Sequence, residues 1–207
     1  METFNNKDHW ENVFATKAEN EVSWYQPIPK TSIAFLETCN LPLDANIIDV
    51  GAGDSHFVDV LLEKGYHNIY ILDISANAID RAKKRLGDKA NQINWIVSDI
   101  LDFKPNVKFD LWHDRASFHF LTSDEKINQY LTISQNAITS NGFLTIGTFS
   151  EKGPTKCSAL QVKQYTETSM TELFKTNFDK IKCISEDHAT PFNTVQNFLF
   201  CSFKRKA

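Results

Sequence analysis

The sequence predicts an α/β protein with a parallel, doubly wound sheet that carries helices on both faces. Two observations lead to this prediction. Apolar runs of strand length alternate four times with segments of helical periodicity, and the connections between them are short. The first apolar run, 47–50, leads through a turn with Gly51 and Gly53 directly into a helix. Strands that alternate with helices over short loops are typical of a parallel sheet covered on both sides.

Length and composition set the class of protein. A chain of 207 residues is long enough for one domain with a full core. Its net charge of −4 disfavours nucleic acid as a partner, because binding a polyanion needs a basic surface. The four cysteines, Cys39, Cys157, Cys183 and Cys201, form no Cys-x-x-Cys pair. We therefore expect reduced, buried thiols and neither a zinc site nor a disulfide scaffold.

The N-terminal segment precedes the first strand. Residues Met1–Lys7 are polar, and no apolar run of the chain approaches the roughly 18 residues of a membrane span, so we expect a soluble, cytoplasmic protein without a membrane partner. Two helices are predicted within residues 8–39, around a loop that contains Trp24 and Tyr25. Either this loop is a lid over a ligand pocket, or its aromatic side chains pin the segment onto the core.

The turn after the first strand is suited to a ligand. Gly51 and Gly53 lack a Cβ, so a ligand can approach the backbone and the free N–H groups at the start of the helix. Asp73 follows the second apolar run, 22 residues after Gly51, where a carboxylate can accept hydrogen bonds from ribose hydroxyls. His56 replaces the third glycine of the dinucleotide fingerprint. This argues for a nucleoside ligand without phosphates and against a nicotinamide dinucleotide.

The third strand, 93–97, also ends in a carboxylate. A helix over 76–86, between Ser75 as N-cap and Gly87 as C-cap, connects it to the second strand. Asp99 follows the third strand, at the edge where open α/β sheets bind ligands, and can accept a proton from the amine of adenine. A turn or helix-capping role for Asp99 is equally compatible with the sequence.

The exit of the fourth strand, 107–112, carries the candidate catalytic residues. His119 is the first candidate for a general base, because a histidine pKa lies near neutrality. The alternative for His119 is a core histidine hydrogen-bonded to the backbone. His113 is less suitable, since it can point into a helix layer. Asp114 and Arg115 either form an ion pair that shapes the pocket, or Arg115 binds an anionic substrate.

The remaining elements complete the sheet. A helix over 124–137 leads to a fifth strand, 143–149, and the polar segment 150–165 is the expected substrate cover. Strands over 178–184 and 195–203 form a terminal hairpin, whose connecting loop contains His188.

These motifs together resemble the class I S-adenosylmethionine-dependent methyltransferases. The resemblance implies a seven-stranded sheet in the order 3-2-1-4-5-7-6, with one antiparallel strand, and S-adenosylmethionine as cofactor. Asp49 and the two glycines would hold its methionine part, Asp73 its ribose, and Asp99 its adenine amine, with Ile74 beside the base. The cofactor-binding residues expected are Asp49, Gly51, Gly53, Asp73, Ile74, Asp99, Ile100 and Trp24, and the catalytic ones His119, Arg115 and Asp114.

The same resemblance suggests one domain over 1–207. Residues 1–44 would form a helical cap or lid, 45–150 the cofactor-binding core, and 151–207 the substrate-cover loop and the hairpin. Four segments are similar to small bacterial methyltransferases near the thiopurine/tellurite-resistance and protein-lysine types: His9–Glu11, Glu21–Gln26, His113–Arg115 and Gln196–Phe198. No Asn/Asp-Pro-Pro-Tyr/Phe follows the fourth strand, unlike in nucleic-acid amino-methyltransferases, and Asp114 lacks a second carboxylate in register, so we expect no metal.

Four functions remain open from the sequence. The leading hypothesis is methyl transfer to a sulfur, nitrogen or oxygen atom of a small molecule. The second is methylation of a protein lysine or chain terminus, and the third is a module that binds the cofactor without chemistry. The fourth, a nicotinamide dehydrogenase, is disfavoured by His56.

Overall fold

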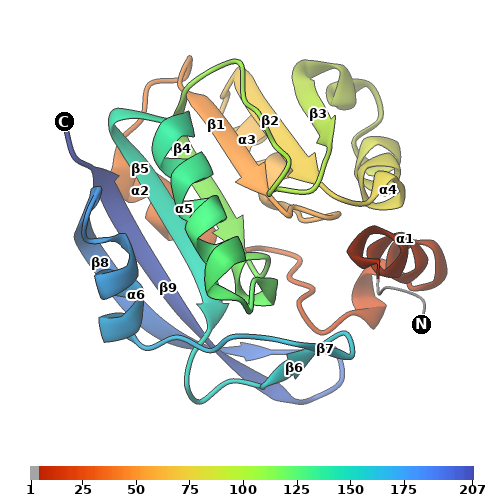
Figure 1. Cartoon of the computed structure of the whole chain (residues 1–207). Helices are drawn as coiled ribbons and strands as arrows, with labels where there is room; N and C mark the ends of the chain where they lie inside the picture. Colours follow the sequence, from red (N-terminus) through yellow and green to blue (C-terminus); the bar gives the residue numbers. More distant parts are fainter. Residues whose placement is uncertain (1–4) are drawn as a thin grey trace.

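The computed structural model describes residues 5–207, so part of the polar segment Met1–Lys7 lies outside the described residues. Its centre is a seven-stranded sheet in the order β3-β2-β1-β4-β5-β9-β8 (Figure 1). Six strands are parallel, and β9 is antiparallel to both of its neighbours. This confirms the predicted order. The strands are β1 Asn46–Val50, β2 Asn68–Asp73, β3 Ile93–Val97, β4 Phe109–Arg115, β5 Ile138–Phe149, β8 Phe178–Ala189 and β9 Val195–Arg205.

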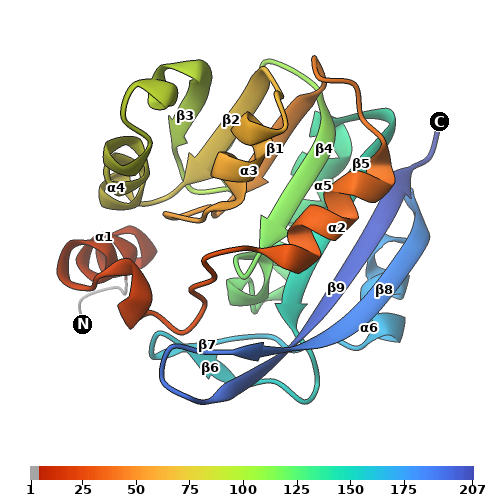
Figure 2. The same cartoon turned by 180° about the vertical axis from the view of Figure 1, so that it is seen from behind.

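Helices cover both faces of the sheet, as predicted. The first face carries α2 Lys30–Cys39, α3 Phe57–Glu63 and α4 Ala76–Leu86, and the second carries α5 Asp124–Ala137 and α6 Glu167–Phe174 (Figures 1 and 2). Short 3₁₀ turns lie at Glu19–Glu21, Gly87–Gln92 and Phe118–Phe120. Alternate residues of β1 show the two layers, because Ile47 packs under α2 and α3 whereas Ile48 packs on the α5 side.

Several boundaries differ from the sequence prediction; β4, for example, covers Phe109–Arg115 and not 107–112, so residues 113–115 belong to the strand. Strand β5 begins at Ile138 and not at residue 143, and β8 continues to Ala189, so the hairpin turn lies at 190–194. His188 is therefore a buried strand residue and not a loop residue. The polar segment 150–165 contains a small ribbon of its own, formed by β6 Lys156–Cys157 and β7 Leu160–Gln161.

The expectation of four reduced cysteines is wrong for one pair. Cys183 and Cys201 form a disulfide, whereas Cys39 and Cys157 are free and buried. The pairing follows from the register of β8 and β9, which places Cys183 directly opposite Cys201. Neighbouring antiparallel residues bring their Cβ atoms close enough for a bond, although the two positions are far apart in sequence.

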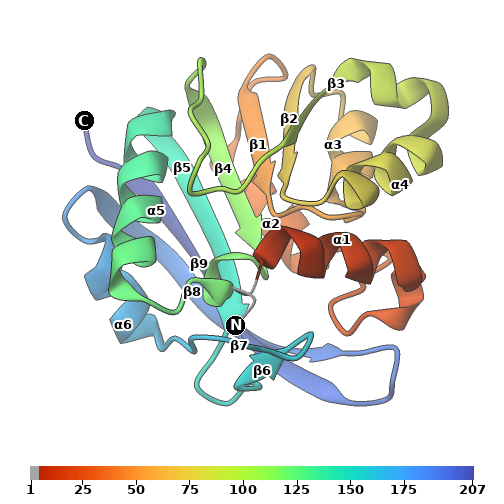
Figure 3. The same cartoon turned by 45° about the vertical axis from the view of Figure 1, so that its right-hand side comes forward.

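The N-terminal helix α1, Asn6–Thr16, lies beside α4 at the carboxyl edge of the sheet (Figures 1 and 3). The Glu11 carboxylate accepts hydrogen bonds from the hydroxyl of Ser75 and from the backbone N–H groups of Ala76 and Asn77, at 2.8, 2.9 and 3.0 Å. Arg81 of α4 in turn donates to backbone carbonyls of α1 and its end. Charged groups at helix ends thus fasten α1 to α4.

Two features are absent from residues 5–207. None of the described helices combines the length and apolarity that crossing a membrane requires. Likewise, the described residues contain no group of three or more histidine, cysteine, aspartate or glutamate side chains that could hold a metal ion.

Candidate active site

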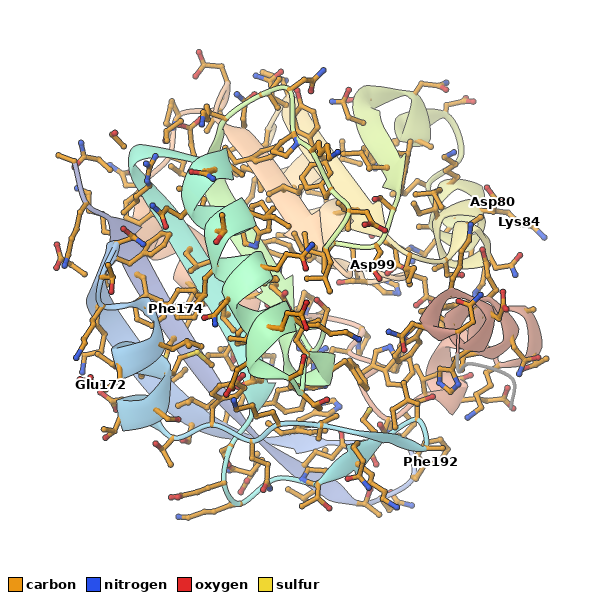
Figure 4. All side chains as sticks on the ribbon, viewed as in Figure 1. Asp80, Lys84, Asp99, Glu172, Phe174 and Phe192 are labelled. Atoms are coloured by element: carbon orange, nitrogen blue, oxygen red, sulfur yellow. A yellow bond between two sulfur atoms is a disulfide. The ribbon has the colours of Figure 1, made fainter. Side chains whose placement is uncertain are left out.

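A cavity of about 370 Å³ opens at the carboxyl edge of β1, β2 and β4 and lies under α1. Figure 4 shows Asp99 at this edge, where the parallel strands end toward α1. All of the expected cofactor-binding residues line the cavity, and so does Arg115: they are Trp24, Asp49, Gly51, Gly53, Asp73, Ile74, Asp99, Ile100 and Arg115. Asp114 and His119 are not among the lining residues.

The glycine turn is fixed by backbone conformation and by its neighbours. Gly51 and Gly53 have φ angles of +62° and +56°, which residues with a Cβ adopt only under strain. A Cβ on Gly51 would lie 2.3 Å from the Cβ of Ser117, and one on Gly53 would lie 2.9 Å from the ring of Phe14. The turn is therefore packed between the exit of β4 and helix α1, and only glycine fits at either position.

Asp73 joins the glycine turn to α4. One carboxylate oxygen accepts from the N–H of Gly53 at 2.7 Å, and the other accepts from the N–H of Ser75 at 2.8 Å. The side chain is buried at the cavity wall, and burial raises its pKa to about 6. Each oxygen has a second lone pair, so the carboxylate can still accept hydrogen bonds from ligand hydroxyls.

Asp49 presents an unused acceptor to the cavity. Its Oδ1 accepts from Nδ1 of His113 at 2.6 Å, while Nε2 of that ring accepts from the hydroxyl of Ser32 at 2.8 Å. The His113 ring also packs on Phe57 of α3, which agrees with the expectation that it points into a helix layer. The buried Oδ2 of Asp49 has no hydrogen-bond partner among the described residues, and it suits a cationic amine.

The third strand contributes the end of the cavity suited to a purine base. Asp99 accepts from the backbone N–H of Leu101 at 2.9 Å, so it forms the turn that the sequence allowed and also lines the cavity. Ile74 and Ile100 provide apolar surface on this part of the wall.

Arg115 and Asp114 do not form the ion pair considered from the sequence. Asp114 accepts from the hydroxyls of Tyr130 and Ser117, both at 2.8 Å, and from the backbone N–H groups of Ser117 and Phe118. Successive strand residues point to opposite faces, so Asp114 is buried on the α5 side while Arg115 faces the cavity. Asp114 therefore holds the exit turn of β4 and touches no substrate space.

His119 lies in the core and does not face the cavity, which corrects the expectation of a base at the cavity wall. Its ring is fully buried, stacks on Phe149 and accepts a hydrogen bond from the backbone N–H of Phe149. Burial, together with the nearby charge of Arg115, lowers its pKa to about 3. The ring therefore stays neutral near physiological pH, as the alternative of a backbone-bonded core histidine predicts.

The cavity also contains residues that the sequence analysis did not assign. Trp10 and Phe14 of α1 line it, and so do Leu160 and Gln161 of the β6–β7 ribbon. The spacing of Trp10 and Phe14, one helical turn apart, indicated a shared face. Nothing in the sequence alone indicated which surface that face would meet.

Comparisons with known proteins agree with this site. Residues 48–144 match a protein family described as a methyltransferase domain. Malonyl-[acyl-carrier protein] O-methyltransferase 1 of Ilyobacter polytropus is 31% identical over 108 residues, which cover 52% of this chain and 39% of that protein. EEF1A lysine methyltransferase 2 of Mus musculus is 26% identical over 161 residues, which cover 68% of this chain and 64% of that protein. This chain thus spans less than two thirds of the length of either relative.

The fold has close counterparts among solved structures. The N-methyltransferase NodS from Bradyrhizobium japonicum WM9, in complex with S-adenosyl-L-homocysteine, superposes with a TM-score of 0.71 over 98% of this chain and 100% of that one. Its sequence identity of 15% makes this a likeness of fold. Sequence motifs, sheet order and family match agree: residues 48–144 match a methyltransferase domain, and the chain as a whole has the fold of a solved methyltransferase.

Proposed function

We propose that this chain transfers the methyl group of S-adenosylmethionine to a small molecule bound in the same cavity. The observation that carries the proposal is the position of α1 over the cavity. Helix α1 covers it and is fastened to α4 through Glu11 and Arg81. On the far side, Nε2 of His9 contacts the hydroxyl of Ser158 in the β6–β7 ribbon at 3.3 Å. An acceptor that reacts under this cover must fit inside it.

The residues present fit the cofactor. The unpartnered Oδ2 of Asp49 suits its amine, the turn of Gly51 and Gly53 leaves the backbone accessible, and Asp73 retains acceptors for two hydroxyls. Asp99 would bind the amine of adenine between apolar neighbours. When bound, S-adenosylmethionine supplies a methyl group on a positively charged sulfur.

The contribution of the chain to the reaction is mainly positioning. Holding acceptor and donor in line, in a cavity from which water is excluded, lowers the barrier by up to roughly 7–11 kcal/mol. His119 faces away from the cavity, and burial raises the pKa of the lining Cys157 thiol to about 11, so neither is a base at neutral pH. The proposal therefore favours an acceptor atom that carries a free electron pair when it arrives.

A protein lysine is the second candidate acceptor. It is supported by the match to EEF1A lysine methyltransferase 2, which extends over 68% of this chain. A lysine side chain on a protein would have to enter after α1 moves, because α1 and the segment up to Pro29 line the cavity.

Two measurements test the proposed function. Calorimetry with S-adenosylhomocysteine should show binding, and radiolabelled S-adenosylmethionine should then label members of a panel of small thiols, amines and carboxylic acids. Labelling of protein bands alone would favour the lysine reaction. Binding without any transfer would favour a cofactor-sensing module. No binding at millimolar concentration would reject the proposal.

A further inference from the structure

The guanidinium of Arg115 has donors that the described chain does not use. Its Nη1 donates to the backbone carbonyl of Trp24 at 2.9 Å, and its Cζ lies 5.1 Å from the ring centroid of Phe198. Its Nε and Nη2 are buried, have no hydrogen-bond partner among residues 5–207, and make no salt bridge there. Unpaired buried donors are rare, and at a cavity wall they indicate a ligand with acceptors.

Charged side chains of both signs line the cavity. The carboxylates come from the carboxyl ends of β1 and β2, from the turns after β1 and β3, and from the segment after α1: Asp49, Asp54, Asp73, Asp99 and Glu19. Two cationic side chains line the cavity as well, Lys126 from α5 and Arg115 from β4, the strand next to β1 and its Asp49. The carboxylates are complementary to a sulfonium cofactor, and the cationic side chains are complementary to an anion.

The position of Arg115 separates the anion from the ribose and the base of the cofactor. Strand β4 separates β1 from β5, and Arg115 reaches across β5 to Phe198 on β9. Its fork thus extends away from β2 and β3, whose carboxylates are suited to the ribose and the base. Building on the proposed function, we propose that Arg115 binds a carboxylate group of the methyl acceptor through its two free N–H groups. A planar guanidinium fork matches a carboxylate in this way.

The side chains that line the cavity with Arg115 indicate the polarity of the rest of the acceptor. They are largely apolar and include Leu160 and four aromatic side chains, Trp10, Trp24, Phe120 and Phe149. The acceptor is therefore a small carboxylic acid with an apolar, preferably aromatic body. A lysine side chain is disfavoured, because its cationic end would approach the like charge of Arg115.

Pairs of carboxylates and their neutral amides test this proposal. The probes are benzoate with benzamide, phenylacetate with phenylacetamide, and 3-phenylpropionate with its amide. Each is titrated into the wild-type protein saturated with S-adenosylhomocysteine. We expect at least one carboxylate to bind about 10- to 100-fold more tightly than its amide, because hydrogen bonds to a charged group contribute this much.

Two variants and a control locate the effect. Arg115→Met should abolish the preference for the carboxylate, and Arg115→Lys, which keeps the charge but loses the fork, should retain only part of it. Arg205→Met is the matched control, because Arg205 also donates to a backbone carbonyl, that of Ile138, and does not line the cavity. Circular dichroism and the affinity for 5′-methylthioadenosine, measured on each variant, report whether the fold is intact.

The outcomes separate this inference from the proposed function. Failure of the wild type to bind S-adenosylhomocysteine rejects the proposed function itself. Normal binding of that ligand with equal affinity for every carboxylate and amide rejects only the role of Arg115. Weaker binding of S-adenosylhomocysteine to Arg115→Met, with unchanged binding of 5′-methylthioadenosine, would assign the carboxylate to the cofactor and overturn the inference. If Arg115→Met loses the preference for carboxylates over amides but binds S-adenosylhomocysteine normally, the inference is supported.

Discussion

At the scale of single residues, Asp73 shows how one side chain can organise a binding site. Its carboxylate holds the N–H groups of Gly53 and Ser75, so the glycine turn and the start of α4 keep their relative position. Burial raises its pKa to about 6, so its ionisation is within reach of ordinary experiments.

The affinity for S-adenosylhomocysteine should therefore depend on the protonation of Asp73. The ionised carboxylate accepts hydrogen bonds at both oxygens, so affinity should be constant well above pH 6 and should decline as the pH falls through about 6. Asp73→Asn should bind about 10- to 100-fold more weakly at neutral pH and lose this pH dependence. Calorimetry between pH 5 and 8 measures both, with the exposed Asp88→Asn as control. An unchanged affinity would remove Asp73 from the site.

His119 should contribute to the pH dependence of stability and not to the reaction. Its pKa is lowered to about 3, so the folded protein does not bind the proton that the unfolded chain binds below pH 6.5. Stability from this group is lost as the pH falls from about 6.5 towards 3, at about 1.4 kcal/mol per pH unit. The free energy of unfolding should fall less steeply between pH 6.5 and 5 in His119→Leu.

The same variant separates the two roles considered for this histidine. Because His119 does not line the cavity, the folded His119→Leu protein should keep its cofactor affinity and its turnover, although it loses the acceptor for the N–H of Phe149. Lost turnover with normal cofactor affinity would instead mean that the ring takes part in the reaction.

At the scale of elements, α1 depends on α4 for its position. The Glu11 carboxylate lies at the N-terminus of α4, where the helix dipole and three hydrogen bonds favour a negative charge. Although burial alone would raise the pKa of Glu11, the hydrogen bonds from Asn77, Ala76 and Ser75 lower it. The charged form is therefore the one that fastens α1.

Glu11→Gln should loosen α1 and accelerate the release of S-adenosylhomocysteine. Loss of the charge at the helix terminus weakens the contact by about 1–2 kcal/mol, which corresponds to roughly a 5- to 30-fold faster dissociation. Stopped-flow dissociation measures this rate. Asp8→Asn, an equivalent change at an exposed position of the same helix, should leave it nearly unchanged. Equal rates in both variants would mean that ligand release does not require α1 to move.

At the scale of the whole molecule, the disulfide between Cys183 and Cys201 closes the terminal hairpin. Closing a loop of this length restricts the unfolded chain and stabilises the fold by roughly 3 kcal/mol. The double variant Cys183→Ala/Cys201→Ala should lose about that much free energy of unfolding in denaturant titrations. Its affinity for S-adenosylhomocysteine should be unchanged, because neither cysteine lines the cavity. As the control, the wild type should lose the same free energy of unfolding when its disulfide is reduced.

The sequence predicted the sheet, and it singled out residues that line the cavity, because both depend on local patterns. Strand periodicity, the glycine turn and a carboxylate at each strand end are read within a few residues of one another. The side-chain orientations at the exit of β4 were not predictable, because a shift of one residue in the pleat exchanges the faces that Asp114 and Arg115 occupy. The disulfide and the place of His188 depend on the register of β8 and β9, which no local pattern specifies.

His188 links the two ends of the described chain. Its Nε2 donates to the backbone carbonyl of Ser23 at 2.8 Å, and its Nδ1 accepts from the side chain of Gln26 at 3.3 Å. During synthesis on the ribosome, residues 23 and 26 emerge long before residue 188. The loop at residues 23–26 therefore lacks these two contacts until translation of the hairpin is nearly complete, although α1 can already be fastened to α4.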